Sequence, residues 1–400
     1  MIRFTTAGES HGRALVAIVE GVPAGLPLLA ADVDADLVRR MTGYGRGARM
    51  KIEADRVQLL AGVRAGATLG SPLALLIENR DFEHWRDVMA PEPAAEPPRR
   101  KLTRPRPGHA DLAGTLKYDR TDARDILERA SARETAARVA AGAVCRRLLA
   151  EFGVEIGSHV VALGGVTALP PSPLPVPLNA AADRSSVRCL DPAAERAMVA
   201  RIDAAKEAGD TLGGVVEVVA RQVVVGVGSH VSWDRRLDGR LAAALMSIPA
   251  VKGVEVGLGF ALGGLPGSAA HDEIARREGE AGWRTGGFAR KTNRAGGLEG
   301  GMTTGEAVVL RVAMKPISTL MRPLGSVDLE SGRSAPAQSE RSDVTAVPAL
   351  GVIAEAAVAL TLADGYLEKF GGDSLGEMRR NCDGYLAALE RRRAGWEPVE

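Results

Sequence analysis

Aromatic residues and cysteines are scarce in this chain of 400 residues. Aromatic residues make up 4% of it, so the core must be built mainly from aliphatic side chains. The three cysteines, Cys145, Cys189 and Cys382, lie far apart and have no metal-ligand spacing. Their odd number and wide separation argue against a disulfide framework and favour a reduced, cytoplasmic setting.

The chain also lacks a charge excess and a long apolar run. Lys and Arg total 51 and Asp and Glu total 50, which argues against nucleic acid or an anionic membrane as the main partner. Arg3 and Glu9 interrupt the start, so no signal peptide is predicted. The longest apolar run, residues 349–363, contains Glu355 and is predicted to be too short to span a bilayer. Any role of the arginines must therefore be local.

Several common functional motifs are missing from the sequence. No GxGxxG follows a predicted strand, and no GxxxxGK[ST] is present, so neither a Rossmann unit nor a Walker loop is predicted. There is no HExxH, and His109 with Asp111 is too little for a metal site. We therefore expect no metal.

Residues 102–147 carry the most informative pattern in the chain. Their first part, 104–114, is a polar turn with two arginines, a histidine and an aspartate. The second part predicts one helix of about 30 residues, capped by Thr121 or Asp122. Arg129 and Arg133 lie four residues apart on one face of that helix, which suggests a bound anion. A seam of small and aliphatic residues predicts a central position: Ala130, Ala137, Ala141, Val144 and Leu148.

The remaining pattern alternates short strands, helices and polar excursions. Length alone allows two or three domains, and the tetrapeptide GSHV, at 157–160 and again at 228–231, hints at an internal duplication. Strands are predicted at 2–6, 14–22, 51–62, 73–78, 154–163, 215–227, 253–260 and 308–314. Helices are predicted at 31–41, 195–208, 237–247 and 345–370, and exposed excursions near 81–100, 165–185 and 267–290.

Four further segments hold candidate functional residues, each with a plainer alternative. His11 lies in a turn, where a lone histidine is more often solvated than catalytic. The glycines of 41–51 either aim Arg40, Arg46 and Arg49 at one anion or form a mobile basic loop. The glycine-rich run 292–305 allows close approach of a flat ring or a phosphate, or forms a tight turn. Residues 341–343 stand just before the positive end of the last long helix, where anions are favoured.

Seven segments taken together resemble the chorismate synthase family. They are AGESHG (7–12), GYGRG (43–47), RPRPGHAD (104–111), RASARETAARVA (129–140), TNRAGGLEGGMTTG (292–305), KPIST (315–319) and ERSDVTAVPALG (340–351), in family order. The resemblance implies an α+β fold, a β-α-β sandwich with helices packed between antiparallel sheets, formed by residues 1–400 as a single domain. It also implies a homotetramer.

The resemblance further implies a carbon–oxygen lyase of the shikimate pathway. Such an enzyme converts 5-enolpyruvylshikimate 3-phosphate to chorismate by 1,4-elimination of phosphate, the step that leads to aromatic amino acids. It depends on reduced FMN without net redox change. The substrate carries two carboxylates and a phosphate, which gives the arginines a purpose.

The family positions imply a role for each candidate residue. His11 is expected to protonate the leaving phosphate, His109 to stabilise charge on the reduced flavin, and Asp343 to act as a relay base. Substrate-binding residues are expected to be Ser10, Arg40, Arg46, Arg49, Arg106, Arg133 and Arg341. FMN contacts are expected from Arg129, Ala130, Ser131, Pro249, Ala250, Gly300, Lys315, Pro316, Ile317, Ser318, Thr319 and Arg341.

Two positions depart from the family pattern, and two alternative functions remain. Pro249 stands where an amide residue is common, and Thr304 where asparagine is frequent. The first alternative is a bifunctional synthase that reduces its own FMN with NADPH, which Arg40 and Arg46 could contact. The second is a non-enzymatic anion-binding scaffold, which would show no flavin dependence.

Overall fold

The computed structural model describes residues 1–47, 53–93, 100–277, 284–339 and 342–393. Arg49 and Arg341 therefore lie outside the described residues. The first sheet has four antiparallel strands in the order β1-β2-β6-β3. Their bounds are Arg3–Ala7 for β1, Ala14–Glu20 for β2, Leu73–Glu78 for β6 and Val57–Ala61 for β3. Alternation along β6 buries Leu73, Leu75 and Ile77 on one face, as a half-buried strand requires.

The second sheet has five antiparallel strands in the order β10-β15-β9-β7-β8. Their bounds are Val251–Val256, Val308–Met314, Gly214–Arg221, Glu155–Leu163 and Val166–Thr167. Four small two-stranded sheets pair β4 (Val63–Arg64) with β5 (Ala67–Thr68), β11 (Ile274–Arg276) with β12 (Phe288–Arg290), β13 (Leu298–Glu299) with β14 (Met302–Thr303), and β16 (Gly325–Val327) with β17 (Ser334–Pro336).

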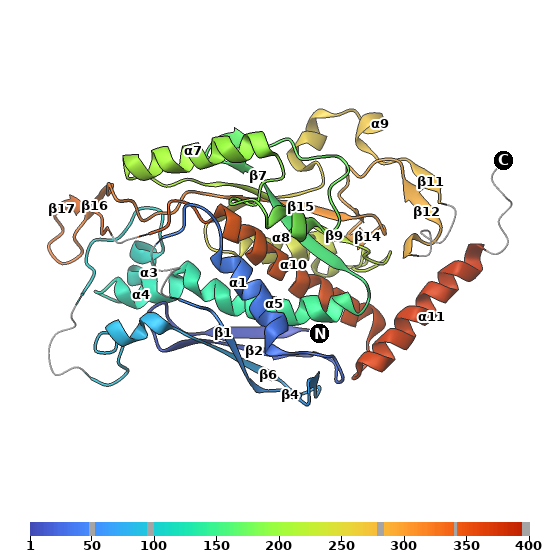
Figure 1. Ribbon diagram of the computed structural model, residues 1–400, viewed down its shortest axis with the longest axis horizontal. Helices are drawn as coiled ribbons and strands as arrows, with labels where there is room; N and C mark the ends of the chain where they lie inside the picture. The colour runs from blue at the N-terminus through green and yellow to red at the C-terminus, as the bar shows by residue number, and fades with distance from the viewer. Residues whose placement is uncertain (48–52, 94–99, 278–283, 340–341, 394–400) are drawn as a thin grey trace.

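Three helices lie between the two large sheets (Figure 1). They are α1 (Ala30–Met41), α5 (Thr135–Ala150) and α10 (Val347–Phe370). Helix α5 packs against β2 and β6 of the first sheet, whereas α10 packs against β7 and β9 of the second. The two helices touch closely because α5 is lined by small residues: a Cβ atom on Gly142 would lie 2.4 Å from Cβ of Ala356. The fold is therefore α+β, with the apolar core centred on α5 and α10.

The remaining helices surround this core. They are α3 (Asp111–Lys117), α4 (Arg124–Ala130), α6 (Leu178–Ala182), α7 (Pro192–Ala208), α8 (Leu237–Met246), α9 (Gly267–Ala270) and α11 (Leu375–Arg393). Short 3-10 turns form η1 (Arg80–His84), η2 (Ala132–Glu134), η3 (Trp233–Arg235) and η4 (Gly259–Gly264). Most strands and helices predicted from periodicity are present with ends within about three residues. The strands predicted at 51–62 and 215–227 are shorter, Val57–Ala61 and Gly214–Arg221, and residues 51 and 52 lie outside the described residues.

The single long helix predicted from residue 121 onward is wrong. The chain forms α4, then an extended residue at Ser131 with φ −65° and ψ 141°, then η2 and α5. The Ser131 hydroxyl accepts a hydrogen bond from the backbone N–H of Arg133 at 3.3 Å, which starts a new helical segment as an N-cap does. Because of this break, Arg129 and Arg133 do not share a helix face.

The apolar run near residue 349 lies inside α10, which begins two residues later than the predicted helix 345–370 and ends with it. Helix α10 has 24 residues and could cross a membrane by length and composition alone, but 83% of its most apolar window is buried inside the protein. Glu355 at its middle is fully buried and contacts Arg39, Arg146 and Arg188. The helix is therefore a core element. The prediction gave insufficient length as the reason why it does not span a membrane, and that reason is wrong, because its length would suffice.

The predicted excursions and repeat have mixed outcomes. Residues 169–176 are largely exposed, but α6 buries Leu178 and Ala182 against the second sheet, so the excursion near 165–185 is shorter than predicted. The described part of 267–290 forms α9 and the β11–β12 hairpin. The first GSHV lies inside β7, whereas the second lies in a turn where Gly228 bridges Met302. The tetrapeptide therefore gives no support to a duplication.

Candidate active site

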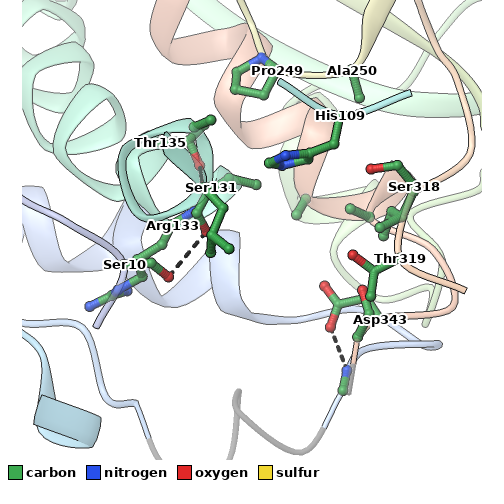
Figure 2. Close-up of a pocket in the computed structure, with 18 of the residues that line it drawn as sticks. Ser10, His109, Ser131, Arg133, Thr135, Pro249, Ala250, Ser318, Thr319 and Asp343 are labelled. Carbon is green, nitrogen blue, oxygen red and sulfur yellow. Dashed lines mark hydrogen bonds between the residues drawn. The ribbon is translucent and has the colours of Figure 1, made fainter. Parts of the chain in front are cut away.

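One cavity of about 830 Å³ lies where the loops of both sheets meet the N-terminal ends of α5 and α10. This volume is within the range of small-molecule sites. Its walls come from the β1–β2 turn, the end of α1, η1, the loop before α3, the α4–α5 junction, the loop before β10, the loop after β15 and the start of α10. Figure 2 shows His109 and Asp343 facing this hollow from different segments. The fold thus gathers segments that are hundreds of residues apart in sequence.

His11 is held on the cavity wall by Glu128 of α4. The ring Nδ1 lies 2.9 Å from Oε1 of Glu128, and the backbone N–H of His11 donates to Oε2 at 2.9 Å. Trp85 stacks on the ring with centroids 4.0 Å apart. Burial of Glu128 opposes its ionisation, but its contacts with His11 and Arg124 hold its pKa below the ordinary value. His11 is therefore a fixed, half-buried ring rather than a solvated one.

His109, in the loop before α3, is also held by a carboxylate, that of Asp111. Its Nδ1 lies 2.5 Å from Oδ1 of Asp111, and Nε of Arg106 donates to Oδ2 of the same carboxylate at 2.8 Å. Burial opposes ionisation of Asp111, yet the hydrogen bonds from His109 and Arg106 hold its pKa far below the ordinary range. Arg106 also donates to the Thr319 hydroxyl at 2.9 Å, which joins the histidine loop to the 315–319 segment.

Arg40 and Arg133 share the buried carboxylate of Asp55. Nη1 of Arg133 donates to Asp55 at 2.6 Å and Nη1 of Arg40 at 3.4 Å. Burial lowers the pKa of Arg40, the attraction of Asp55 opposes this effect, and repulsion from Arg133 and Arg46 adds to it. The resulting pKa is about 9, so Arg40 stays charged at neutral pH. Nη2 of Arg133 makes no hydrogen bond within the described residues and lies 3.7 Å from Glu53. This nitrogen is therefore buried beside a carboxylate, with its hydrogen-bonding capacity unused within the described residues.

Arg46 and Asp343 form a third charged pair at the cavity. Nε of Arg46 lies 3.3 Å from Oδ2 of Asp343, and the backbone N–H of Gly47 donates to Oδ1 at 2.5 Å. Gly45 has φ +86°, a left-handed conformation that glycine adopts without strain. In its described part the glycine-rich segment is thus an ordered loop that directs Arg46 inward.

The last wall combines polar groups with an apolar surface. Lys315 donates to the carbonyl of Gly108 at 2.6 Å, and its partial burial, with repulsion from Lys252, lowers its pKa. Ser131 donates to the neighbouring Ser10 hydroxyl at 3.1 Å, which joins the α4–α5 junction to the β1–β2 turn (Figure 2). Apolar atoms of the first turns of α10 and of the loop before β10 complete the wall.

Most of the predicted site residues line this cavity. Two do not: Arg129 is exposed and donates to the Thr6 carbonyl at 2.8 Å, and Gly300 lies in the β13–β14 turn. Arg49 and Arg341 lie outside the described residues. The predicted residues at the cavity are Ser10, His11, Arg40, Arg46, Arg106, His109, Ala130, Ser131, Arg133, Pro249, Ala250, Lys315, Pro316, Ile317, Ser318, Thr319 and Asp343.

Sequence reasoning missed several residues of the site. Asp81 and Trp85 line the cavity, although 81–100 was predicted to be an exposed excursion; its first residues instead form η1 against the β1–β2 turn. Asp55 and Glu128 also escaped notice, since their partners lie far away in sequence. The one local signal was the spacing of four between Arg124 and Glu128, which is typical of a helical ion pair.

Comparison with known proteins identifies close relatives of the chain. The family model described as chorismate synthase matches residues 2–367. A chorismate synthase of Moorella thermoacetica is 59% identical over 390 residues, covering 98% of this chain and 100% of the relative. One of Symbiobacterium thermophilum is 58% identical over 398 residues, with 98% and 100% covered. A solved structure titled as the crystal structure of chorismate synthase is similar with a TM-score of 0.78 and 41% identity, covering 98% of both chains.

Proposed function

The chain belongs to the chorismate synthase family, and from this premise we propose that the cavity between the sheets binds reduced FMN and 5-enolpyruvylshikimate 3-phosphate together. Chorismate synthase is a lyase of the shikimate pathway that eliminates phosphate from this substrate, and the family requires reduced FMN. The relatives reported above are named as chorismate synthases, so neither the bifunctional NADPH-dependent alternative nor the anion-binding scaffold is supported.

The lining of the cavity fits a flavin. A flat ring needs an apolar wall, which Ala130, Pro249, Ala250 and the start of α10 provide, and a flavin phosphate needs donors such as Lys315 and the hydroxyls of 318–319. When bound, reduced FMN supplies the transient electron that the elimination requires. The protein residues bind, orient and move protons around it.

The substrate anions find donors on the other wall. Arg40, Arg46, Arg106 and Arg133 line the cavity beside Ser10. Nη2 of Arg133 has no hydrogen-bond acceptor among the described residues. Charge-assisted hydrogen bonds to carboxylate and phosphate are about twice as strong as neutral ones. We propose that these groups, with Arg49 and Arg341, hold the three anionic groups of the substrate.

Three residues are proposed to manage charge and protons. His11 presents a ring nitrogen from which it donates a proton to the leaving phosphate, a role that contributes about 10²–10⁴-fold to rate in enzymes generally. Asp343, held by Gly47 and Arg46, accepts the substrate proton as relay base. His109, held by Asp111, stabilises charge near the reduced ring.

The larger organisation is proposed from the same premise. The packing of α1, α5 and α10 between two antiparallel sheets supports a β-α-β sandwich. The continuous core, which runs from Leu15 to Cys382, supports a single domain. We propose a cytoplasmic homotetramer with neither nucleic acid nor membrane as partner.

One observation carries the proposal: His11, His109, Asp343 and four arginines share one cavity. The test is an anaerobic assay of the purified chain with 5-enolpyruvylshikimate 3-phosphate and FMN, either reduced or oxidised. Chorismate and phosphate should form only with reduced FMN. A His11→Ala variant that keeps wild-type turnover with saturating reduced FMN would exclude the acid role.

A further inference from the structure

Glu128 contacts both residues of the Ser10–His11 pair through three separate groups. Its backbone carbonyl accepts from the N–H of Ser10 at 2.8 Å, its Oε2 accepts from the N–H of His11 at 2.9 Å, and both its carboxylate oxygens lie within 3.0 Å of His11 Nδ1. The side chain is 3% exposed. A buried carboxylate with this many contacts to one dipeptide fixes the position of that dipeptide.

The contact also fixes which ring nitrogen carries hydrogen. An ionised carboxylate only accepts hydrogen bonds, so Nδ1 of His11 must be the donor. Nε2 is then the nitrogen left to face the cavity, and it lies 3.9 Å from Oδ2 of Asp81. A neutral ring with hydrogen on Nδ1 could only accept at Nε2, whereas the protonated ring donates there.

The neighbouring groups hold Glu128 in its ionised form and hold the ring in place. Nη1 of Arg124 donates to Oε1 of Glu128 at 2.9 Å, and the Arg124 guanidinium also lies over Trp85, 4.8 Å from its centroid. Trp85 covers the face of the His11 ring. The carboxylates beside the ring are thus Glu128 from α4 and Asp81 from η1, while the guanidinium groups of Arg124 and Arg100 lie over Trp85, that of Arg100 at 4.2 Å from its centroid. This arrangement provides a counter-charge for a protonated imidazole.

We propose that Glu128 is a positioning residue that holds His11 with Nδ1–H toward the protein and a protonated Nε2 toward the leaving phosphate. It does not touch the substrate and acts only through His11. This inference rests on the proposed acid role of His11. It predicts that removing the negative charge of Glu128, without removing its shape, changes the protonation of His11 over the working pH range.

The test compares Glu128→Gln with the wild type and with Glu134→Gln. Glu134 is similarly buried, at 5% exposed, and it pairs with Arg138 rather than with a histidine, so it is a matched control for loss of a buried charge. With reduced FMN saturating, Glu128→Gln should lower kcat by about 10²-fold, the lower end of what a positioned acid contributes. The alkaline limit of its pH–rate profile should move to lower pH, while KM changes much less.

A second readout is independent of turnover. Nitrogen-15 NMR of the histidine ring, assigned with His11→Ala, should show a protonated Nδ1 in the wild type and an altered tautomer or charge state in Glu128→Gln. If the NMR signals and the pH profile of Glu128→Gln match the wild type while His11→Ala is inactive, the positioning role is wrong and the acid role stands. If His11→Ala is fully active, the acid role itself fails, whatever Glu128→Gln does. An equal loss in Glu134→Gln would reduce Glu128 to a general structural role.

Discussion

The buried carboxylate of Asp55 offers the sharpest test of how the cavity balances stability against anion binding. Asp55 is 1% exposed and lies between Arg40 and Arg133, which are 4% and 5% exposed. Its contacts with their Nη1 atoms, at 3.4 and 2.6 Å, neutralise charge that water cannot reach. Asp55→Asn keeps the shape of the side chain but removes the negative charge that neutralises the two guanidinium groups.

The magnitude follows from these distances. At an effective dielectric constant of about 20, the contact at 3.4 Å corresponds to about 5 kcal/mol of attraction and that at 2.6 Å to about 6 kcal/mol, before desolvation is subtracted. Breaking a buried pair by removing one partner costs about 3–5 kcal/mol. Glu53 remains 3.7 Å from Nη2 of Arg133, so the lower end applies. We expect Asp55→Asn to lower the free energy of unfolding by about 3 kcal/mol.

The substrate should restore part of this loss. Bound carboxylate or phosphate supplies the negative charge that the variant lacks, so the ligand stabilises the variant more than the wild type. A ligand at about 100 times its Kd stabilises a protein by about 2.7 kcal/mol. The variant should gain more than the wild type when both receive the same saturating substrate with oxidised FMN, which prevents turnover.

The assay is denaturant unfolding of both proteins with and without 5-enolpyruvylshikimate 3-phosphate. Asp125→Asn is the control, because Asp125 pairs with Arg120 on the surface, where such pairs contribute about 0–1 kcal/mol. If Asp55→Asn is no less stable than Asp125→Asn, the two arginines do not depend on Asp55. Equal ligand stabilisation of variant and wild type would show that the anions do not reach this cluster.

Two further predictions concern the core. Burial opposes ionisation of Glu355, but Arg39, Arg146 and Arg188 hold its pKa far below the ordinary value; its stabilising contribution is therefore complete above about pH 5 and is lost as the pH falls below that. Glu355→Gln should lower the free energy of unfolding by about 3–5 kcal/mol at pH 7. In a plot of the unfolding midpoint against pH, the decline at acid pH should be less steep in the variant than in the wild type. An equally steep decline would contradict this prediction. Gly142→Ala should destabilise by about 1–3 kcal/mol, because its Cβ would overlap Ala356. Gly239→Ala, at an exposed position of α8 with open space around it, should instead stabilise by up to about 1 kcal/mol in the same unfolding assay. Equal effects of the two substitutions would refute the packing argument.

Periodicity was enough to predict the layers of the fold but not the break that shapes the site. The strand predicted at 73–78 is β6 with the same ends, because a short continuous apolar run follows Pro72 and polar residues follow it. The helix pattern from residue 121 continues through Ser131, and the one local sign of a new start is Ser131 itself, a residue type that commonly caps helices. The break is stabilised by contacts from distant segments, among them the Ser10 hydroxyl at 3.1 Å. Local sequence does not encode such partners.

The same limit explains which site residues were found. The residues expected to touch ligand came from the resemblance, and most of them line the cavity. The carboxylates that hold these residues were not predicted, because Glu128 is 117 residues from His11 and Asp55 is 78 residues from Arg133. Trp85 was missed for another reason: it lies in a polar, proline-containing stretch whose composition is typical of a surface loop.

The carboxylates also bear on the proposed binding of a triply anionic substrate in the cavity. Each of the four described arginines at its wall contacts an acid: Arg40 and Arg133 contact Asp55, Arg46 contacts Asp343, and Arg106 contacts Asp111. The guanidinium groups are thus largely neutralised before ligand arrives, and fixed charge alone does not account for affinity. The N-terminal ends of α5 and α10 both line the cavity, and each adds the positive end of a helix dipole. We therefore expect the proposed anion binding to depend on where these two core helices begin as well as on the arginines. The break at Ser131 precedes the start of α5, so we expect it to influence the chemistry of the site.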